Sequence, residues 1–201
     1  MKIHSLTCTP TAVDADGVCA SQTPGAGAIL INGALATGGV ATMGAAQLIR
    51  LTSGGNDTGI TFTFTGTDAN GRPVSQTVAG TNASNTDTTT HFKTITGITA
   101  SAAVAGTVIV GNLIESVSPS AEFGQHLANP FQAGIGCVIG GTVTYGMQQT
   151  YDGSTWFDHA TITGKSANFD GSLLFPVMAM RAKVTASTSG TVTATIVRSG
   201  N

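Results

Sequence analysis

Charged residues are scarce in this chain of 201 residues. They make up 9% of the sequence, whereas an ordinary soluble protein contains about 25%. The eight lysines and arginines are scattered, and the formal net charge is −2. Nucleic-acid binding requires several basic side chains that neutralise neighbouring phosphates together. The sequence therefore predicts no direct contact with nucleic acid, and its polar surface must come largely from Thr, Ser, Asn and Gln.

Long apolar runs are also missing. A membrane-spanning helix needs about 18 or more consecutive apolar residues, and no run approaches that length although the mean hydropathy is +0.23. The N-terminal residues lack the uninterrupted apolar core of a signal peptide. We therefore expect no membrane partner, assembly in a cytoplasm, and apolar surface that is covered by other protein subunits. The alternative is a weakly charged β domain that acts alone.

Cysteine is rare and odd in number, with Cys8, Cys19 and Cys137. A disulfide framework requires an even count and an oxidising compartment. A Cys8–Cys19 bridge stays open as an alternative, but the sequence favours buried free thiols.

A strand–turn–strand pattern recurs along the chain, at residues 50–64, 98–110 and 184–197. In each copy a β-branched run is followed by a bend of small residues and a second run, in which threonine alternates with apolar residues at 61–64 and 191–196. Such alternation places the apolar side chains on one face of a half-buried antiparallel strand. A further strand is expected at residues 173–177. No segment keeps a 3.6-residue period over three turns, so at most one short helix is expected.

Turn signals divide the chain into three segments. Residues 1–45 are predicted to be an extended Gly/Ala-rich arm with short strands that pack on the first unit. Residues 46–118 are predicted to form a first β-sandwich, and residues 119–201 a second sandwich or jelly roll, with the boundary near Pro119 in a connector over residues 111–130. The expected fold class is all-β, with two antiparallel sandwich-like or jelly-roll-like units.

Carboxylates, the commonest acid/base groups, number only ten. Six aspartates in expected turns lie within three residues of a glycine or asparagine: Asp14, Asp16, Asp57, Asp68, Asp152 and Asp170. Side-chain hydrogen bonds to the turn backbone explain aspartates at such positions without catalysis. A wall-degrading enzyme would need a convergent acid/base pair hidden among them. We predict no catalytic residue, and keep the enzyme as a separate hypothesis.

Metal-binding patterns are incomplete. The sequence Asp14-Ala15-Asp16-Gly17 begins like a calcium loop, but the third oxygen ligand and the later Glu of an EF-hand are missing. The four histidines, at positions 4, 91, 126 and 159, have no metal-ligand spacing. The sequence therefore predicts no metal site and no bound cofactor.

Aromatic residues other than Phe are confined to one segment. Tyr145, Tyr151, Trp156 and Phe157 lie within a dozen or so positions of one another. One interpretation is a sugar-binding platform, and another is an aromatic plug that closes the second sandwich. A contact between subunits is the third, because interfaces favour Tyr and Trp. The sequence favours the plug or the subunit contact.

Several phrases resemble small virion structural proteins of tailed bacteriophages. They are VDADGVCASQTP (13–24), GTDANGRP (66–73), FKTITGITAS (92–101), GSTWFDH (153–159), FPV (175–177) and RAKVT (181–185). The resemblance spans nearly the whole chain, and it carries over no catalytic residue.

The resemblance implies a non-enzymatic component of the virion, and two placements stay open. A capsid decoration (cement) protein would bind the major capsid protein and other copies of itself, and would stabilise the head lattice. A neck, tail or fibre component would bind neck or tail proteins, and could bind glycans through the aromatic segment. The low charge and the lack of a fibrous repeat favour the decoration protein.

Overall fold

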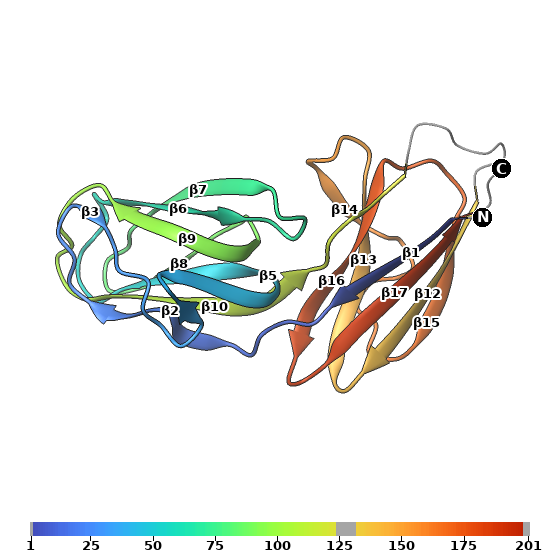
Figure 1. The fold of residues 1–201 in the computed structure, drawn as a ribbon, viewed down its shortest axis with the longest axis horizontal. Helices are drawn as coiled ribbons and strands as arrows, with labels where there is room; N and C mark the ends of the chain where they lie inside the picture. The colour runs from blue at the N-terminus through green and yellow to red at the C-terminus, as the bar shows by residue number, and fades with distance from the viewer. Residues whose placement is uncertain (1, 124–131, 199–201) are drawn as a thin grey trace. The chain divides into compact units, whose positions relative to one another are not determined.

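The computed structural model describes residues 2–123 and 132–198, and these residues form seventeen β-strands (Figure 1). Every strand pair with a recorded register is antiparallel. The described residues contain no helix, and therefore none that is long and apolar enough to cross a membrane. The predicted all-β, antiparallel fold class is confirmed.

The chain divides into two compact units. Unit 1 consists of Met1–Pro10 and Glu115–Asn201, and unit 2 consists of Thr11–Ile114. The boundary expected near Pro119 thus falls between Ile114 and Glu115. The histidine at position 126 and the Asn-Pro pair at 129–130 lie outside the described residues.

Unit 2 is built around eight strands that lie wholly within it. They are β2 (Asp14–Gln22), β3 (Gly27–Ala28), β4 (Ala36–Thr37), β5 (Val40–Ser53), β6 (Thr61–Thr67), β7 (Pro73–Ala79), β8 (Asn85–Asp87) and β9 (Phe92–Ala100). Strand β10 (Val108–Val117) begins in unit 2 and ends in unit 1. The pairing order within unit 2 is β10-β5-β9-β6-β7, and β2 pairs with β10.

Alternation in the sequence explains the core of unit 2. Phe62 and Phe64 point inward from β6, while the threonines that alternate with them point outward. Together with Phe92 they are fully buried in a cluster of Ile, Val, Leu and Met side chains. A hairpin turn joins β6 and β7: Gly71 adopts φ 78°, and Asp68 Oδ1 accepts hydrogen bonds from two backbone amides of the turn.

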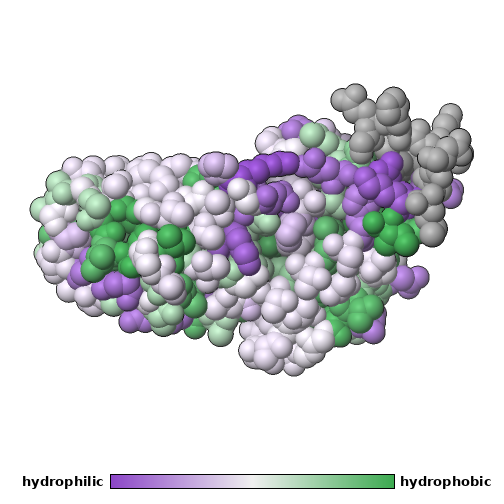
Figure 2. Space-filling view, viewed as in Figure 1, coloured by the Kyte–Doolittle hydropathy of each residue, from purple (hydrophilic) through white to green (hydrophobic). Residues whose placement is uncertain are grey.

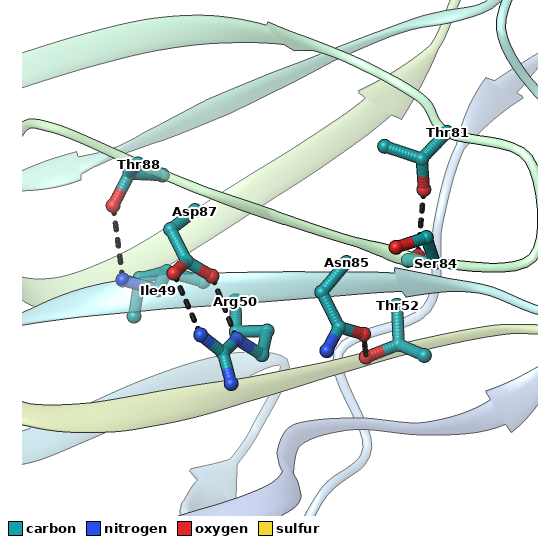
Figure 3. Close-up of polar contacts among 8 residues, drawn as sticks. All are labelled: Ile49, Arg50, Thr52, Thr81, Ser84, Asn85, Asp87 and Thr88. Carbon is teal, nitrogen blue, oxygen red and sulfur yellow. Dashed lines mark hydrogen bonds and ion pairs between the residues drawn. The ribbon is translucent and has the colours of Figure 1, made fainter.

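A short polar strap, β8 and the residues beside it, lies along β5 (Figure 3). Asp87 accepts two hydrogen bonds of 2.7 Å from the Arg50 guanidinium. The backbone amide of Ile49 donates to Thr88 Oγ1 at 2.9 Å, and Thr88 is buried. These contacts satisfy polar groups on one edge of β5 without using an apolar side chain.

Unit 1 is a sandwich of two antiparallel layers (Figure 1). One layer has the order β1-β17-β12-β15, with β1 (Lys2–Cys8), β17 (Thr191–Arg198), β12 (Ala133–Gly140) and β15 (Phe169–Leu173). The other contains β14 (Trp156–Asp158), β13 (Val143–Thr150), β16 (Ala179–Ser187), β11 (Ala121–Glu122) and the end of β10. Between them are buried side chains that include Leu6, Met147, Ile162, Leu173, Val184, Val192 and Ile196.

The N-terminal 45 residues differ from the arm expected on the first unit. Strand β1 pairs with β17 over seven residues and buries Leu6 and Cys8 in unit 1. Residues 36–45 of the expected arm include β4 and the beginning of β5. Alternation identifies a strand but does not identify a partner that lies far away in the sequence, which explains the difference.

Candidate functional site

The four aromatic residues singled out in the sequence lie in three different environments. Tyr145 on β13 is fully buried, and its hydroxyl donates a hydrogen bond of 2.9 Å to the Ala167 carbonyl. Burial and the neighbouring Cys137 raise the pKa of Tyr145 to about 12. Tyr145 therefore belongs to the core of unit 1, as the plug interpretation requires, and is not available to a ligand.

Trp156 is half-buried on the edge strand β14. The guanidinium carbon of Arg181 lies 4.0 Å from the centre of the indole ring, in cation–π contact. Arg181 also donates to Gln148 Oε1, and Gln148 Nε2 donates to Asp158 Oδ1, both at 2.9 Å. This chain of contacts fixes the indole and covers one of its two faces.

Tyr151 and Phe157 form an exposed aromatic pair. Their ring centres are 5.9 Å apart with the planes at 57°, and the residues are 54% and 51% exposed. A second exposed segment lies beside them: the Met178 amide donates to the Thr150 carbonyl at 2.8 Å, and the Met178 side chain lies next to Gly153. This segment also presents Leu174 and Phe175.

We call this surface the apolar rim. It consists of the exposed side chains of the two segments: Tyr151 and Phe157 on the loop, Met178 beside that loop, and Leu174 and Phe175 a few residues before Met178 in the chain. Figure 2 shows that most of the visible surface has intermediate hydropathy, with strongly apolar atoms gathered in separate areas. Single exposed apolar side chains are ordinary in proteins, whereas groups of them mark contact sites.

The loop that carries the aromatic pair is organised by Asp152. Its carboxylate accepts hydrogen bonds from the amides of Ser154 (2.8 Å) and Thr155 (2.6 Å) and from the Thr155 hydroxyl (2.8 Å). These donors hold the pKa of Asp152 well below its usual range. Gly153 supports the turn with φ 78°. The loop is therefore pre-organised, which reduces the entropy lost when Tyr151 and Phe157 enter an interface.

The sequence did not identify three of the rim residues, Leu174, Phe175 and Met178, as exposed. Residues 173–177 were expected to be a strand, but β15 ends at Leu173 and Leu174, Phe175 and Met178 are exposed. Pro176 supplied the available signal, because proline donates no backbone hydrogen bond and interrupts a strand pattern.

Three of the aspartates expected in turns have local partners. Asp14, Asp68 and Asp152 accept hydrogen bonds from backbone amides two residues further on, as predicted for turn aspartates. Asp57 is different: it is fully buried, and its Oδ1 accepts a hydrogen bond of 2.7 Å from the Ala105 amide. Asp57 thus holds together two loops of unit 2.

The histidine and cysteine side chains with resolved contacts are structural. His159 is buried, and its Nδ1 accepts hydrogen bonds of 3.3 Å from the amides of Thr161 and Ile162. Burial lowers the pKa of His159, opposed by a hydrogen bond with the Ser172 backbone. All three cysteines are buried and form no disulfide bond, and burial raises the pKa values of Cys19 and Cys137 to about 11. Within residues 2–123 and 132–198, no group of three His, Cys, Asp or Glu residues could hold a metal ion.

Comparisons with known proteins identify no relative by sequence. No protein-family model matches the chain, and no curated protein sequence matches it. Among solved structures, Saccharomyces cerevisiae allantoicase aligns with 94% of this chain and 89% of its own, at 6% identity and a TM-score of 0.24. The STIV MCP aligns with 97% of this chain and 96% of its own, at 10% identity and a TM-score of 0.20. The infectious bursal disease virus VP2 subviral particle aligns with 97% of this chain and 71% of its own, at 12% identity and a TM-score of 0.23. TM-scores this low do not indicate a common fold.

Proposed function

We propose that this chain is a non-enzymatic structural protein of a virion, and that it is a capsid decoration (cement) protein. The observation that carries the proposal is the apolar rim of unit 1. Five large apolar side chains, each close to half exposed or more, are presented there on two adjoining segments.

The composition of the rim matches that of protein interfaces. Aromatic residues and Met are enriched where proteins bind one another, whereas Lys, Glu and Asp are depleted at the centre of such contacts. The loop bearing Tyr151 and Phe157 is held by the Asp152 hydrogen bonds, so little flexibility is lost on binding. A rim of this kind supports attachment to another protein.

The resemblance to virion proteins of tailed bacteriophages indicates which partner the rim would bind. The rim would bind the major capsid protein in a particle assembled in the host cytoplasm, and copies of the chain would contact one another across the head lattice. One small interface is weak by itself, but several that are engaged together hold a protein on a surface with far greater strength.

The test uses particles that lack this protein. Purified wild-type protein, Phe157→Ser and Phe175→Ser are added back, and the bound amount is measured by quantitative gel analysis. We expect each substitution to weaken attachment about tenfold or more. The matched control is Leu30→Ser, which replaces an apolar residue of unit 2 that is 63% exposed. Equal attachment of Phe157→Ser, Phe175→Ser and wild type would contradict the proposal.

The copy number in native particles separates the two placements. A number comparable with that of the major capsid protein supports decoration of the head. A few copies per particle would instead support a neck, tail or fibre component.

Glycan binding is the second candidate function, favoured by the planar polar side chains beside Trp156. Gln148, Arg181 and Asp158 are of the types that recognise sugar hydroxyls, and one face of the indole is covered by Arg181. Glycan-array binding that is lost in Trp156→Ala would support this function. If the wild-type protein binds no glycan on the array, glycan binding is excluded for the glycans tested.

A further inference from the structure

The outer face of the β1-β17-β12-β15 sheet in unit 1 has an unusual composition. Its side chains form four rows across the strands, set by the register of the three strand pairs. The rows are Ile3-Val197-Gly134-Ser172, Ser5-Thr195-Gly136-Asp170, Thr7-Thr193-Val138 and Thr9-Thr191-Gly140. We call this surface the smooth face, because it is made almost entirely of Gly, Ser, Thr, Val and Ile.

The opposite outer face of unit 1 is different. There, Arg181 packs on Trp156, and Lys183 pairs with Glu115 at 3.1 Å. The smooth face has one charged residue, Asp170, on its edge strand β15. It also exposes two large apolar side chains, since Ile3 is 57% and Val138 58% exposed. The two faces belong to one sandwich, so the overall low charge of the chain does not explain the contrast.

We infer that the smooth face is a contact between two copies of this chain, stacked sheet on sheet about a two-fold axis. This inference rests on the proposed function, in which copies meet one another, and it names the surface through which they do so.

The shape of the face is self-complementary. Val138 projects from β12 between two glycines, Gly136 and Gly140, and Gly134 follows on the same side of the strand. At each of these glycines the space where a Cβ would lie is open, with no other atom within 4 Å. The face therefore carries a projection and hollows in one column, at steps of about 6.6 Å.

Two copies related by a two-fold axis can pair the Val138 projection of each copy with the glycine hollows of the other. In an isologous contact each residue pair occurs twice, because the same patch is used by both copies. Val138 of one copy can occupy the hollow over Gly134 and Gly136 of the second copy, and the second copy's Val138 can do the same in return. A flat foreign surface would neither fill the hollows of this face nor accommodate its projection.

The hydroxyl groups of the face are partly satisfied within it. Thr7 Oγ1 lies 3.3 Å from Thr193 Oγ1, and Thr9 Oγ1 lies 2.9 Å from Thr191 Oγ1, in each case within hydrogen-bond distance. A buried hydroxyl without a partner costs free energy, whereas a paired one costs much less. These threonine pairs therefore allow the face to be covered at a low desolvation cost.

The area of the face predicts a weak contact. Four strands spaced about 4.8 Å apart, with about seven residues each at about 3.3 Å per residue, cover about 450 Å². A standard stable interface buries about 800 Å² on each partner. We therefore expect a monomer in dilute solution and dimers at high concentration, with stronger association wherever copies are held near one another.

The test is sedimentation velocity on the full-length protein over a wide concentration series. Wild type is expected to shift from monomer to dimer as concentration rises. Val138→Lys would place an unpaired charge in the contact and should weaken dimerisation about tenfold or more. The matched control is Thr185→Lys, an exposed β-branched position on β16 outside the smooth face. Circular dichroism verifies that both variants remain folded, as expected for exposed positions.

The outcomes are separable from those of the attachment test. Dimerisation lost in Val138→Lys and kept in Thr185→Lys supports the inference. Wild type that stays monomeric at the highest concentrations, or dimers unaffected by Val138→Lys, overturns it. Dimers lost in Phe157→Lys but not in Val138→Lys would assign the contact to the apolar rim and also overturn it. None of these results decides whether the rim binds particles, because the attachment test measures that binding separately.

Discussion

Unit 1 and unit 2 are both antiparallel β structures of similar size, but they distribute their large apolar side chains differently. Among the described residues, nine large apolar side chains are exposed, and seven of them belong to unit 1. The seven are Ile3, Val138, Tyr151, Phe157, Leu174, Phe175 and Met178. The exposed ones of unit 2 are Val13 and Leu30. Unit 2 also buries all three of its aromatic residues, Phe62, Phe64 and Phe92, completely.

This difference is the basis of both proposals, which assign binding surfaces to unit 1 and none to unit 2. Unit 2 uses its large side chains for its own core and covers its polar backbone with straps such as β8. Unit 1 leaves two surfaces with apolar side chains, the rim and the smooth face, and these carry both proposals. The comparison can be tested unit by unit, because the single tryptophan and both tyrosines lie in unit 1.

The largest expected effect is a buried charge in unit 1. Val184 is fully buried on β16, so Val184→Asp would place a carboxylate without a partner in the core. We expect a loss of several kcal/mol and unfolding of unit 1. Trp156 fluorescence during urea denaturation reports this loss, and hydrogen exchange at residues 61–79 reports unit 2. Equal loss of protection in both units would show that they unfold together and would break the comparison.

Phe62→Ala is the corresponding test of unit 2. Removing a fully buried Phe side chain should cost about 3–5 kcal/mol. The matched control is Phe157→Ala in unit 1, where the ring is half exposed and the change should stay within about 0.5 kcal/mol. Far-UV circular dichroism in urea measures both variants. A Phe157→Ala loss as large as that of Phe62→Ala would mean that the rim is part of a core.

Leu6→Ala examines which unit the N-terminal strand stabilises. Leu6 is 5% exposed and faces the unit 1 core from β1, an edge strand, so we expect a loss of about 2 kcal/mol. The loss should be seen by Trp156 fluorescence and not by hydrogen exchange in unit 2. Thr7→Ala, on the outward side of the same strand, is the control. A loss confined to unit 2 would contradict the pairing of β1 with β17.

The smallest effect is the pH dependence of unit 1. Burial lowers the pKa of His159 in the folded state below 6.5, and burial together with Lys2 and Arg198 lowers the pKa of His4. On acidification, the histidines of the unfolded chain therefore bind protons at a higher pH than those of the folded chain. The stability of unit 1 should fall as the pH falls through 6.5 towards the folded pKa values. Urea midpoints from Trp156 fluorescence measure this fall, which His159→Gln should reduce. Midpoints that are constant or rise on acidification would contradict it.

Individual residues show how far the sequence could predict the site. Alternation around Phe62 and Phe64 identified a half-buried strand correctly. The aromatic segment was also found, because Tyr and Trp are rare in the chain. The sequence did not predict which residues of this segment are buried and which are exposed: Tyr145 is buried, whereas Tyr151 and Phe157 are exposed. The register shift between Thr144 and Tyr145 places Tyr145 opposite Val184 on the core side, and no local signal marks that shift.

The amino-acid sequence by itself determined that the chain is all-β, where most strands and turns lie, and that its surface has few charges. These properties depend on neighbouring residues, through side-chain alternation and the backbone preferences of Gly, Asn and Pro. Only the tertiary structure decided that residues 2–8 pair with β17, that Met178 lies beside Gly153 of the aromatic loop, and that Val138 stands among glycines on an open face. Such groupings arise from pairing between segments far apart in the chain, where many registers satisfy the same alternation and packing of the whole core selects one of them.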